Sequence, residues 1–306
     1  MVLFLLGLFV GAGILYLFMK PSAPRGPEPA EPPAPARSEA PPRASRRAEP
    51  RKLPSDRLPS DHVEPEAPAA VPAATETVTG PVHGARIALV IDDLGHDVAD
   101  LRPLEALGVP VTYSVLPYEP QTPEVVAELR RRKAEILLHL PMEPVHGENP
   151  GPGALLQGMS DGELRQKTED ALKAVPGAVG VNNHMGSLLS SEEGPMNTVL
   201  SVLAERNLFF LDSRTSAQSV GYKVALSLGV PAAERQVFLD GDESPEAIHT
   251  QFQRLLALAR TRGAAIAIGH PHPETLAALT REVPKAKADG FEFVPVSYLL
   301  TKAGGE

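Results

Sequence analysis

Carboxylate and imidazole side chains recur in this chain directly after short apolar segments. They are Asp92-Asp93, His139, Asn183-His184, Asp212, Asp240 and the pair His270-x-His272. Two or three His residues with a carboxylate, and no thiolate, match a divalent ion such as Zn²⁺ that keeps an open position for water. A metal in such a site lowers the pKa of bound water and polarises a carbonyl group. A nearby carboxylate accepts the proton of the water and a His protonates the leaving group, so these residue types indicate metal-assisted hydrolysis of an amide or ester.

Each of these residues taken singly also has an ordinary structural explanation. The adjacent carboxylates of Asp92 and Asp93 repel each other, so the pair needs a cation or an unequal sharing of protons, unless it only caps the segment Gly95–Leu101. In an extended segment the two side chains point in opposite directions, which leaves one for the metal and one for the proton. A residue such as His139, at the end of an apolar strand, is also typical of a hydrogen-bonded core. The metal interpretation therefore depends on the whole set.

The set must be positioned by strands and helices, and the sequence predicts both. Short apolar segments alternate with amphipathic ones after Arg86, and strands are predicted at 87–91, 109–115, 135–140, 178–182, 208–211, 237–239, 264–268 and 291–296. Helices are predicted to begin at the capping box Ser160-x-x-Glu163 and at Ser244-Pro245. Strands that are apolar throughout suit a parallel sheet covered on both faces. Such a chain forms one α/β domain, either a (β/α) barrel or a doubly wound sheet.

The positions of the polar residues favour the barrel. Sites in parallel α/β folds form at the carboxyl ends of the strands. Five or more separate strands contribute to this set, which suits a ring better than an open sheet. We therefore expect a barrel of seven or eight parallel strands with the site at one end.

Composition excludes several other classes of protein. The 306 residues include no Cys, which excludes a disulfide scaffold, a thiolate zinc site, an iron–sulfur cluster and a Cys nucleophile. The net charge of −9 is opposite to that of a protein that binds the phosphate backbone, so no nucleic acid partner is expected. No segment matches the P-loop or the dinucleotide-binding fingerprint.

The first 85 residues differ in kind from the rest. The segment Val2–Met19 is apolar or small throughout, and as a helix it would be roughly 27 Å long, enough to span a bilayer. No basic residue precedes it and Lys20-Pro21 follows it, so we predict an uncleaved transmembrane anchor over 1–20, with a cleaved signal peptide as the alternative. Residues 21–85 contain 16 of the 33 Pro and few large apolar side chains, which predicts a disordered linker. The globular domain is expected over 86–306.

The sequence indicates less directly on which side of the membrane the globular domain lies. Lys20 and Arg25 follow the predicted anchor, and the positive-inside rule taken alone would keep that side cytoplasmic. Long domains are translocated largely regardless of charge. We therefore expect the chain to be anchored in the inner membrane with its globular domain exported to the periplasmic side.

Five ordered motifs make residues 86 to about 300 resemble the divergent polysaccharide deacetylase family of bacterial envelope proteins. They are VIDDLG (Val90–Gly95), LHLPMEP (Leu138–Pro144), NNHMGS (Asn182–Ser187), LDSRTS (Leu211–Ser216) and IGHPHPET (Ile268–Thr275). The resemblance implies a distorted (β/α) barrel, a divalent metal, usually zinc, and removal of N- or O-acetyl groups from sugars.

The resemblance also implies roles for individual residues. Asp92 is similar to the catalytic base of the better-known deacetylases, Asp93 to a metal ligand, and His270 to the general acid. His139 matches the first His of their next motif, whereas Glu143 occupies the position of the second. We expect His184 to replace that missing ligand, so that the metal is bound by Asp93, His139 and His184. Residues expected around them, in contact with ligands or substrate, are Glu143, Asn183, Asp212, Arg214 and His272. Arg214 would either keep Asp92 ionised or form a structural ion pair.

Three hypotheses follow for function. The first is a membrane-tethered, metal-dependent deacetylase acting on an acetylated saccharide, a cell-wall fragment or a related amide. The second, favoured by Glu143 and by the absence of Trp, is a non-catalytic envelope module that uses the same barrel to bind an envelope protein or assemble with it. The third takes His270-x-His272 as the metal pair of an amidohydrolase-like barrel.

Overall fold

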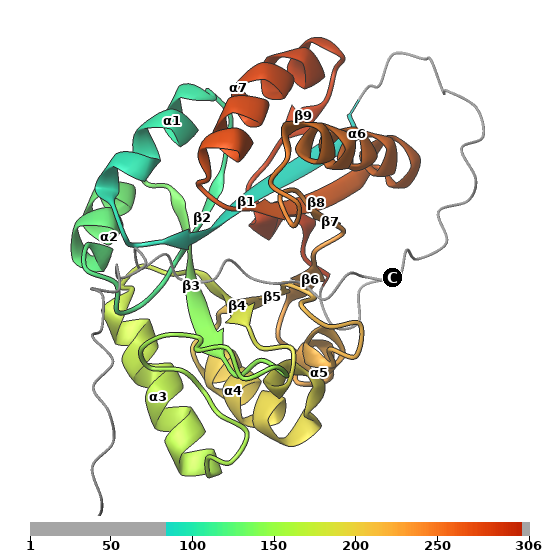
Figure 1. The fold of residues 1–306 in the computed structure, drawn as a ribbon. Coiled ribbons are helices and arrows are strands. Elements are labelled where there is room, and N and C mark those ends of the chain that lie inside the picture. The colour runs from blue at the N-terminus through green and yellow to red at the C-terminus, as the bar shows by residue number, and fades with distance from the viewer. Residues whose placement is uncertain (1–83, 302–306) are drawn as a thin grey trace, which may run out of the picture. The chain divides into compact units, whose positions relative to one another are not determined.

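The computed structural model describes residues 84–301, where nine strands alternate with helices around one curled sheet (Figure 1). The strands are β1 (Arg86–Leu94), β2 (Thr112–Val115), β3 (Glu135–Met142), β4 (Gly180–Met185), β5 (Phe209–Asp212), β6 (Ala232–Glu234), β7 (Val237–Phe238), β8 (Ala264–Gly269) and β9 (Glu292–Phe293). Their order is β6-β5-β4-β3-β2-β1-β8-β7, with β9 beside β1, and every pair is parallel. The predicted parallel α/β architecture is confirmed.

The sheet does not close into a ring through backbone hydrogen bonds. Within residues 84–301 no ladder pairs β6 with β7, which stand at the two ends of the order and are joined along the chain by Arg235-Gln236. Arg235 donates its Nε–H to the carbonyl oxygen of Ser213, just after β5, at 2.6 Å. Gln236 accepts a hydrogen bond from the backbone N–H of Ile266 in β8 at 2.7 Å. The two sheet edges are thus linked by side chains, and the closed barrel expected from the sequence is replaced by a curled, incompletely paired one.

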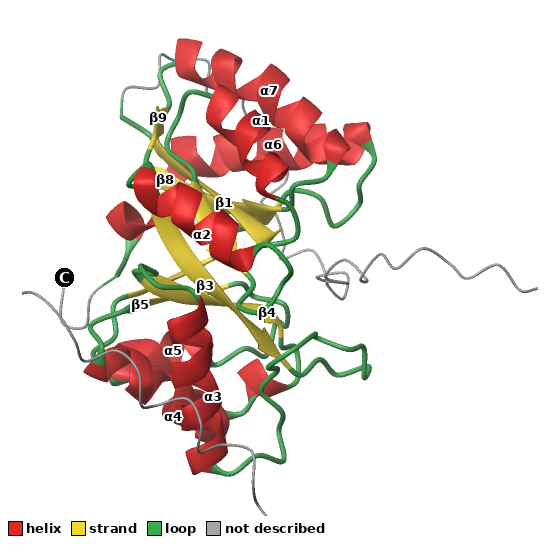
Figure 2. Cartoon of the chain, turned by 90° about the vertical axis from the view of Figure 1, so that its left-hand side faces the viewer, coloured by secondary structure: helices red, strands yellow, loops and turns green. Residues whose placement is uncertain are grey.

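Helices cover the outside of the curled sheet (Figure 2). The α-helices are α1 (Leu101–Ala106), α2 (Thr122–Arg131), α3 (Asp161–Ala174), α4 (Glu193–Glu205), α5 (Gly221–Ser227), α6 (Pro245–Arg262) and α7 (Pro273–Ala288), and the 3₁₀ turns are η1 (Val98–Asp100), η2 (Leu189–Ser191) and η3 (Val296–Leu299). Helix α7 packs against α1 and α6, and α4 packs against α3 and α5. None of the helices within 84–301 has the length and apolarity needed to cross a bilayer.

Strand side chains alternate between two apolar layers. Ile87, Leu89 and Ile91 belong to the large core between the sheet and the helices. Ala88 and Val90 belong to a smaller cluster on the other face, which also contains Leu137, Phe209, Leu211, Ala233, Ile266, Ile268 and Val296. Because side chains along a strand alternate with a period of two, the next residue on this inner face of β1 is Asp92. The inner face therefore changes from apolar to polar near the carboxyl ends of the strands.

Both helix starts predicted from the sequence are confirmed. The Ser160 side chain accepts from the N–H of Glu163, and the Glu163 carboxylate accepts from the N–H of Ser160, which completes the capping box of α3. Ser244 caps α6 with its side chain alone, which accepts from the N–H of Ala247, and Pro245 follows at the start of the helix. The predicted strand 291–296 is shorter than expected: only Glu292–Phe293 pair, and a 3₁₀ turn begins at Val296. The short strand β6 was not predicted.

The predicted anchor over 1–20 and all but the last two residues of the predicted linker over 21–85 lie outside the described residues.

Candidate metal centre and active site

Asp92 and Asp93 both face the same site because the backbone of β1 is irregular at its end. Asp93 has φ +57°, a left-handed conformation that Asp adopts more readily than most residues. The pairing of β1 with β2 shifts register between Ile91 and Leu94, as at a β-bulge. The expectation that the two carboxylates point in opposite directions is therefore wrong, because it assumed a regular extended strand.

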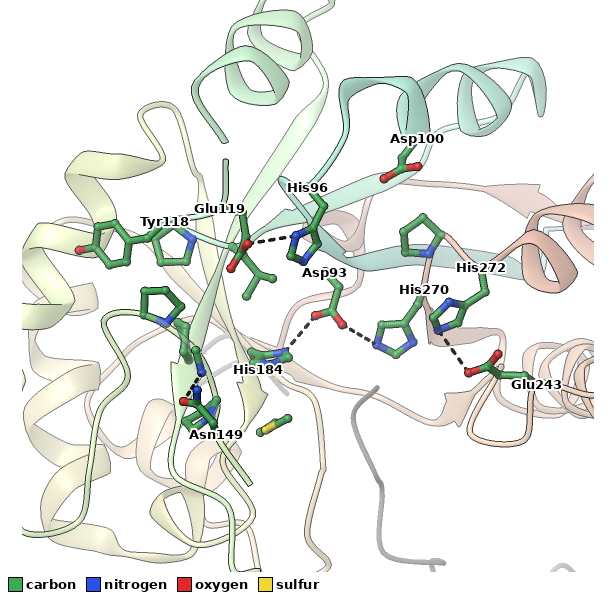
Figure 3. Close-up of a pocket in the computed structure, with 18 of the residues that line it drawn as sticks. Asp93, His96, Asp100, Tyr118, Glu119, Asn149, His184, Glu243, His270 and His272 are labelled. Atoms are coloured by element: carbon green, nitrogen blue, oxygen red, sulfur yellow. Dashed lines mark hydrogen bonds and ion pairs between the residues drawn. The ribbon is translucent and has the colours of Figure 1, made fainter. Parts of the chain in front are cut away.

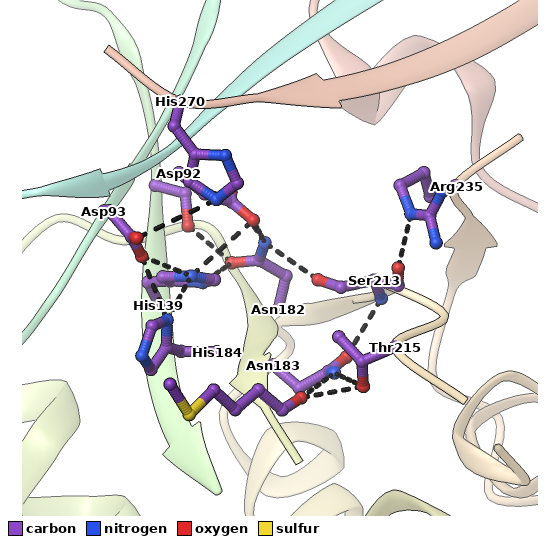
Figure 4. Close-up of polar contacts among 12 residues, drawn as sticks. Asp92, Asp93, His139, Asn182, Asn183, His184, Ser213, Thr215, Arg235 and His270 are labelled. Carbon is purple, nitrogen blue, oxygen red and sulfur yellow. Dashed lines mark hydrogen bonds and ion pairs between the residues drawn. The ribbon is translucent and has the colours of Figure 1, made fainter. Parts of the chain in front are cut away.

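Asp93, His139 and His184 converge from β1, β3 and β4 (Figure 4). Oδ1 of Asp93 lies 3.1 Å from Nε2 of His139 and 2.9 Å from Nδ1 of His184. The two imidazole nitrogens are themselves 3.2 Å apart. Both His residues are buried, and Asp93 is half-buried. One carboxylate and two imidazoles around a common point form a ligand set that suits a divalent ion.

The burial and charge of Asp93 are consistent with a ligand of a divalent ion. Its Oδ1 atom is buried and accepts no hydrogen bond of regular geometry. Burial alone would raise the pKa of Asp93, but the positive charge of His184 and the nearby His139 outweigh burial and hold the pKa well below its usual range. A charged carboxylate beside two imidazoles is a donor set that a divalent ion accepts, so these three residues can hold a metal.

Asn182 determines which nitrogen of His139 faces this point. The Asn182 Nδ2 donates to both carboxylate oxygens of Asp92, at 2.9 and 3.1 Å, which turns its Oδ1 toward Nδ1 of His139 at 3.0 Å. An amide oxygen only accepts, so Nδ1 of His139 must carry the proton. In the neutral ring, Nε2 is then the nitrogen whose lone pair is available to a metal, as a metal-binding imidazole requires.

Asp92 differs from its neighbour in electrostatics. It is 1% exposed, and burial raises the pKa of Asp92 despite the opposing charges of His139 and His270. Its Oδ2 lies 3.6 Å from Nε2 of His139. A carboxylate with a raised pKa beside a ligand set has the properties of a general base.

His270, at the end of β8, approaches the site from the opposite side. Its Nδ1 lies 3.0 Å from Oδ1 of Asp240, and its Nε2 lies 3.8 Å from Oδ2 of Asp93. Asp240 also accepts from the backbone N–H of His270 at 2.6 Å and from Thr275 Oγ1 at 2.8 Å. Burial acts to raise the pKa of Asp240, but the charge of His270 and these hydrogen bonds prevail and lower it. A charged Asp240 therefore fixes the ring of His270 and favours its protonated form.

These residues open into a cavity of about 790 Å³ (Figure 3). Its lining includes Asp93, His184, His270 and His272. His139 and Asp92 lie deeper, at 0% and 1% exposure. Asp93, His184 and His270 are therefore reachable from the cavity, whereas His139 and Asp92 are covered.

Sequence comparison agrees with the motifs. The family model described as divergent polysaccharide deacetylase matches residues 89–300. The chain belongs to the divergent polysaccharide deacetylase family. It is 36% identical over 230 residues to the uncharacterized protein YibQ of Escherichia coli K12, covering 75% of this chain and 72% of YibQ. It is also 36% identical over 194 residues to an uncharacterized protein of Haemophilus influenzae, covering 63% of this chain and 69% of that protein.

A solved structure shares the fold. The crystal structure of the uncharacterized protein ATU2773 from Agrobacterium tumefaciens C58 superimposes with a TM-score of 0.66 at 29% identity, covering 72% of this chain and 91% of that one. The curled parallel sheet is thus common to this chain and ATU2773.

The remaining residues that were predicted for the site lie around the ligand set and are not part of it. Glu143 accepts a hydrogen bond from the backbone N–H of Gln157 at 2.6 Å and is outside the ligand set. Asn183 donates to the carbonyl oxygen of Met185 and accepts from the N–H of Ser213, so it ties β4 to the segment after β5. His272 lines the cavity, with Nε2 at 3.8 Å from Glu243.

Asp212 and Arg214 organise the segment that follows β5. Asp212 accepts hydrogen bonds from the N–H of Arg214, the hydroxyl of Ser219 and the N–H of Tyr222. The Arg214 guanidinium donates to the carbonyl oxygens of Ser219 and Ala217 and lies 3.8 Å from Glu234. The expected contact between Arg214 and Asp92 is not formed among the described residues; Asn182 holds Asp92 instead.

Two important residues of the site were not assigned a role from the sequence. Asn182 lies within the NNHMGS motif, two positions before His184, so the period of a strand could have indicated that both side chains share a face. Asp240 follows the apolar segment 237–239, but nothing local indicates that it pairs with a residue thirty positions later.

Proposed function

We propose that this chain is a metal-dependent hydrolase of the carbohydrate deacetylase type, which removes an acyl group from an envelope sugar or a related amide. The observation that supports this most strongly is the convergence of Asp93, His139 and His184 beside Asp92 and His270 at one cavity. The ligand set suits Zn²⁺ because it combines two imidazoles with one carboxylate and contains no thiolate. Membership of the family supports a carbohydrate substrate.

The reaction divides between two side chains. A divalent ion bound by Asp93, His139 and His184 supplies Lewis acidity for the acyl carbonyl and a lowered pKa for water. Asp92, with its raised pKa, accepts the proton of the attacking water at its carboxylate, which Asn182 orients.

His270 acts at the other end of the reaction. Its Nδ1 is held by the carboxylate of Asp240, so its Nε2 faces the cavity side of the site, 3.8 Å from Asp93. A His that is hydrogen-bonded to a buried carboxylate is stabilised as the imidazolium, and Nε2 can then donate its proton to the departing amine or alkoxide.

Metal content tests the ligand assignment. Elemental analysis of the full-length wild type and of His249→Ala, a His whose side chain is 49% exposed, should give the same zinc content. His139→Ala and His184→Ala should lose the zinc because each removes one of three ligands. Equal zinc in all four proteins would contradict the assignment.

The cluster of Asp240, His270 and His272 allows a separate comparison, since its ligand atoms also lie within 4.8 Å of one another. We expect His272→Ala to retain zinc, because Asp240 is already engaged by His270 and Thr275. Loss of zinc from His272→Ala but not from His184→Ala would instead favour the amidohydrolase-like arrangement.

Hydrolysis tests the activity itself. Zinc-loaded protein should release acetate from acetylated chito-oligosaccharides, and Asp92→Asn should abolish the release while leaving zinc bound. Zinc binding without hydrolysis of any acetylated sugar or model ester would favour the alternative, a non-catalytic envelope module on a deacetylase-like fold.

We further propose that the domain works on the periplasmic side of the inner membrane, attached by residues 1–20. The absence of Cys allows a direct test, because a single Cys introduced for Lys223, whose side chain is 81% exposed, would be the sole thiol. A membrane-impermeant maleimide should label Lys223→Cys in intact spheroplasts. Labelling only after lysis would contradict export.

A further inference from the structure

The cavity has a wall that the proposed chemistry does not use. Beyond the His and Asp residues, one side is formed by Tyr118 with Pro117, Pro150 and Pro152. Tyr118 is 41% exposed, so much of its surface is available to a ligand. Figure 3 shows Tyr118 at one end of the cavity and Glu243 and His272 at the other, with Asp93 between them and the Tyr118 hydroxyl turned away from Asp93. The part of Tyr118 nearer the site is therefore its apolar ring.

The ring of Tyr118 is held in place by the loop between β3 and α3. A Cβ atom at Gly153 would lie 2.2 Å from Cε2 and 2.7 Å from Cδ2 of Tyr118, so the ring edge packs directly on the backbone of this glycine. Gly153 also has φ +79°, which disfavours any other residue. A large apolar ring that is partly exposed and fixed in orientation costs little entropy when a ligand packs on it.

The polar lining of the cavity includes groups of both kinds. Its carboxylates are Asp93, Asp100, Glu119, Glu243 and Glu274, and its imidazoles are His96, His184, His270 and His272. Glu119 lies 3.0 Å from His96, and Glu243 lies 3.8 Å from His272. Tyr118 therefore offers a large apolar ring within a lining that is otherwise largely polar.

We propose that Tyr118 is a stacking platform for a sugar ring of the ligand. The inference rests on the proposed function for the class of ligand. The C–H face of a pyranose ring packs against the apolar face of Tyr118, and the adjoining prolines extend the same surface. The acyl group of the bound sugar then lies toward Asp93 and His184.

Calorimetric titration of the full-length chain carrying Asp92→Asn, which prevents turnover, measures this binding directly. The probe is the neutral N-acetylglucosamine tetramer, which should bind to the chain that has Tyr118 in place.

Variants of the platform identify the residue. Tyr118→Ala should weaken binding of the neutral tetramer by about tenfold, since it removes one large apolar contact, and Tyr118→Phe should recover most of the loss. Gly153→Ala should weaken binding because its Cβ displaces the ring. Gly147→Ala is the matched control: it has a similar φ of +75° in the same loop, and its Cβ would meet no atom within 4 Å. Thermal denaturation of each variant verifies that it is folded.

Several results would overturn the proposal. They are a lack of binding of the neutral tetramer, unchanged binding by Tyr118→Ala, or equal losses from Gly153→Ala and Gly147→Ala. None of these depends on zinc content or hydrolysis. If the protein hydrolyses acetylated sugars and Tyr118→Ala leaves the KM unchanged, the platform alone is refuted. If the protein binds the neutral tetramer through Tyr118 but holds no zinc, the metal-dependent hydrolase alone is refuted.

Discussion

Asn182 shows how one neutral side chain can prepare two catalytic groups. Its amide nitrogen satisfies Asp92 and its amide oxygen selects the tautomer of His139, which leaves Nε2 of His139 available to a metal. A charged residue in this place would disturb either Asp92 or the metal. Buried polar networks of this kind are stable only when every member is satisfied, and Ser114 supplies one further donor to Asn182 Oδ1 at 2.5 Å.

Loss of this amide should weaken the metal site without removing a ligand. We expect Asn182→Ala to lower zinc affinity by roughly 10- to 100-fold, because the ring of His139 is no longer held in the ligating tautomer. Competition with a zinc chelator measures the affinity, and nitrogen-15 NMR of His139 reports the tautomer. Asn197→Ala, at an exposed position of α4, serves as the control. An unchanged affinity or tautomer would show that Asn182 only fills space.

The charge of Asp92 should cost stability in the metal-free protein. Its pKa is raised from 3.8 by burial, so the folded state binds this proton more tightly than the unfolded state. The contribution of Asp92 to stability therefore falls as pH rises from about 3.8 through the raised pKa, and Asp92→Asn removes this loss. Urea denaturation in the presence of a chelator should show that Asp92→Asn is more stable than wild type at pH 7 and that the difference shrinks toward pH 3.8.

Asp242 provides the opposite case. Hydrogen bonds from Ser244 lower the pKa of its exposed carboxyl, so its contribution to stability is lost as pH falls through the lowered pKa. Asp242→Asn should therefore not stabilise the protein at pH 7. The same trend in both variants would mean that the burial of Asp92 is not the cause.

Regular strands and helices follow from local sequence patterns. The end of β1 departs from the regular strand pattern. Alternation directs Asp92 inward after Ala88 and Val90, and a regular continuation would direct Asp93 into the helical layer. The left-handed conformation of Asp93 and the register shift against β2 bring both carboxylates to one side. The bulge thus determines whether the Asp-Asp pair can act as a base and a ligand at the same site.

The capping box of α3 offers a test of a purely local element. Ser160→Ala should destabilise the domain by about 1 kcal/mol, since it leaves the N–H of Glu163 without its side-chain acceptor. For a domain of this size the melting temperature should fall by roughly 2–4 °C. Ser201→Ala, whose hydroxyl bonds back to the carbonyl of Asn197 within α4, should have little effect. An equal loss in the two variants would contradict the assigned cap, and zinc content should be unaffected in both.

At the scale of the whole molecule, the ligand set connects distant parts of the chain. Asp93, His139 and His184 come from β1, β3 and β4, so a metal bound by all three can exist only in the folded state. Its binding free energy is therefore added to the stability of the domain.

Zinc should raise the melting temperature of the wild type. At a free concentration 100 times the dissociation constant, the stabilisation is about 2.7 kcal/mol, or roughly 5–10 °C for a domain of this size. The increase should decline as the solution is made acidic, because metal binding requires unprotonated imidazole nitrogens and competes with protons. Asp93, with its pKa well below the usual range, remains charged and does not cause this decline. Differential scanning calorimetry with zinc and with chelator measures both effects, and an equal zinc shift in His184→Ala would contradict them.

The features that depend on one short segment of the chain were predicted correctly from the sequence. The capping residue Ser160, the proline after Ser244 and the apolar strands leading to Asp92, His139 and His270 are all readable from spacing. Five motifs also identified the family, which the family model confirms over residues 89–300. Where two segments must meet, the same reasoning left alternatives open: Arg214 was expected either beside Asp92 or in a structural ion pair, and it bonds to its own loop and lies 3.8 Å from Glu234.

By itself, then, the sequence determined the parallel α/β class, the alternation that directs Asp92 inward, and a set of His and Asp residues with no thiol among them. These depend on periodicity and on residue type, which are local properties. Only the tertiary structure decided that β6 and β7 stay unpaired, that Asp93 turns to the same side as Asp92, and that Asp240 holds His270. Each of these depends on strand register or on a contact between side chains far apart in the chain, and both are selected by the packing of the whole domain.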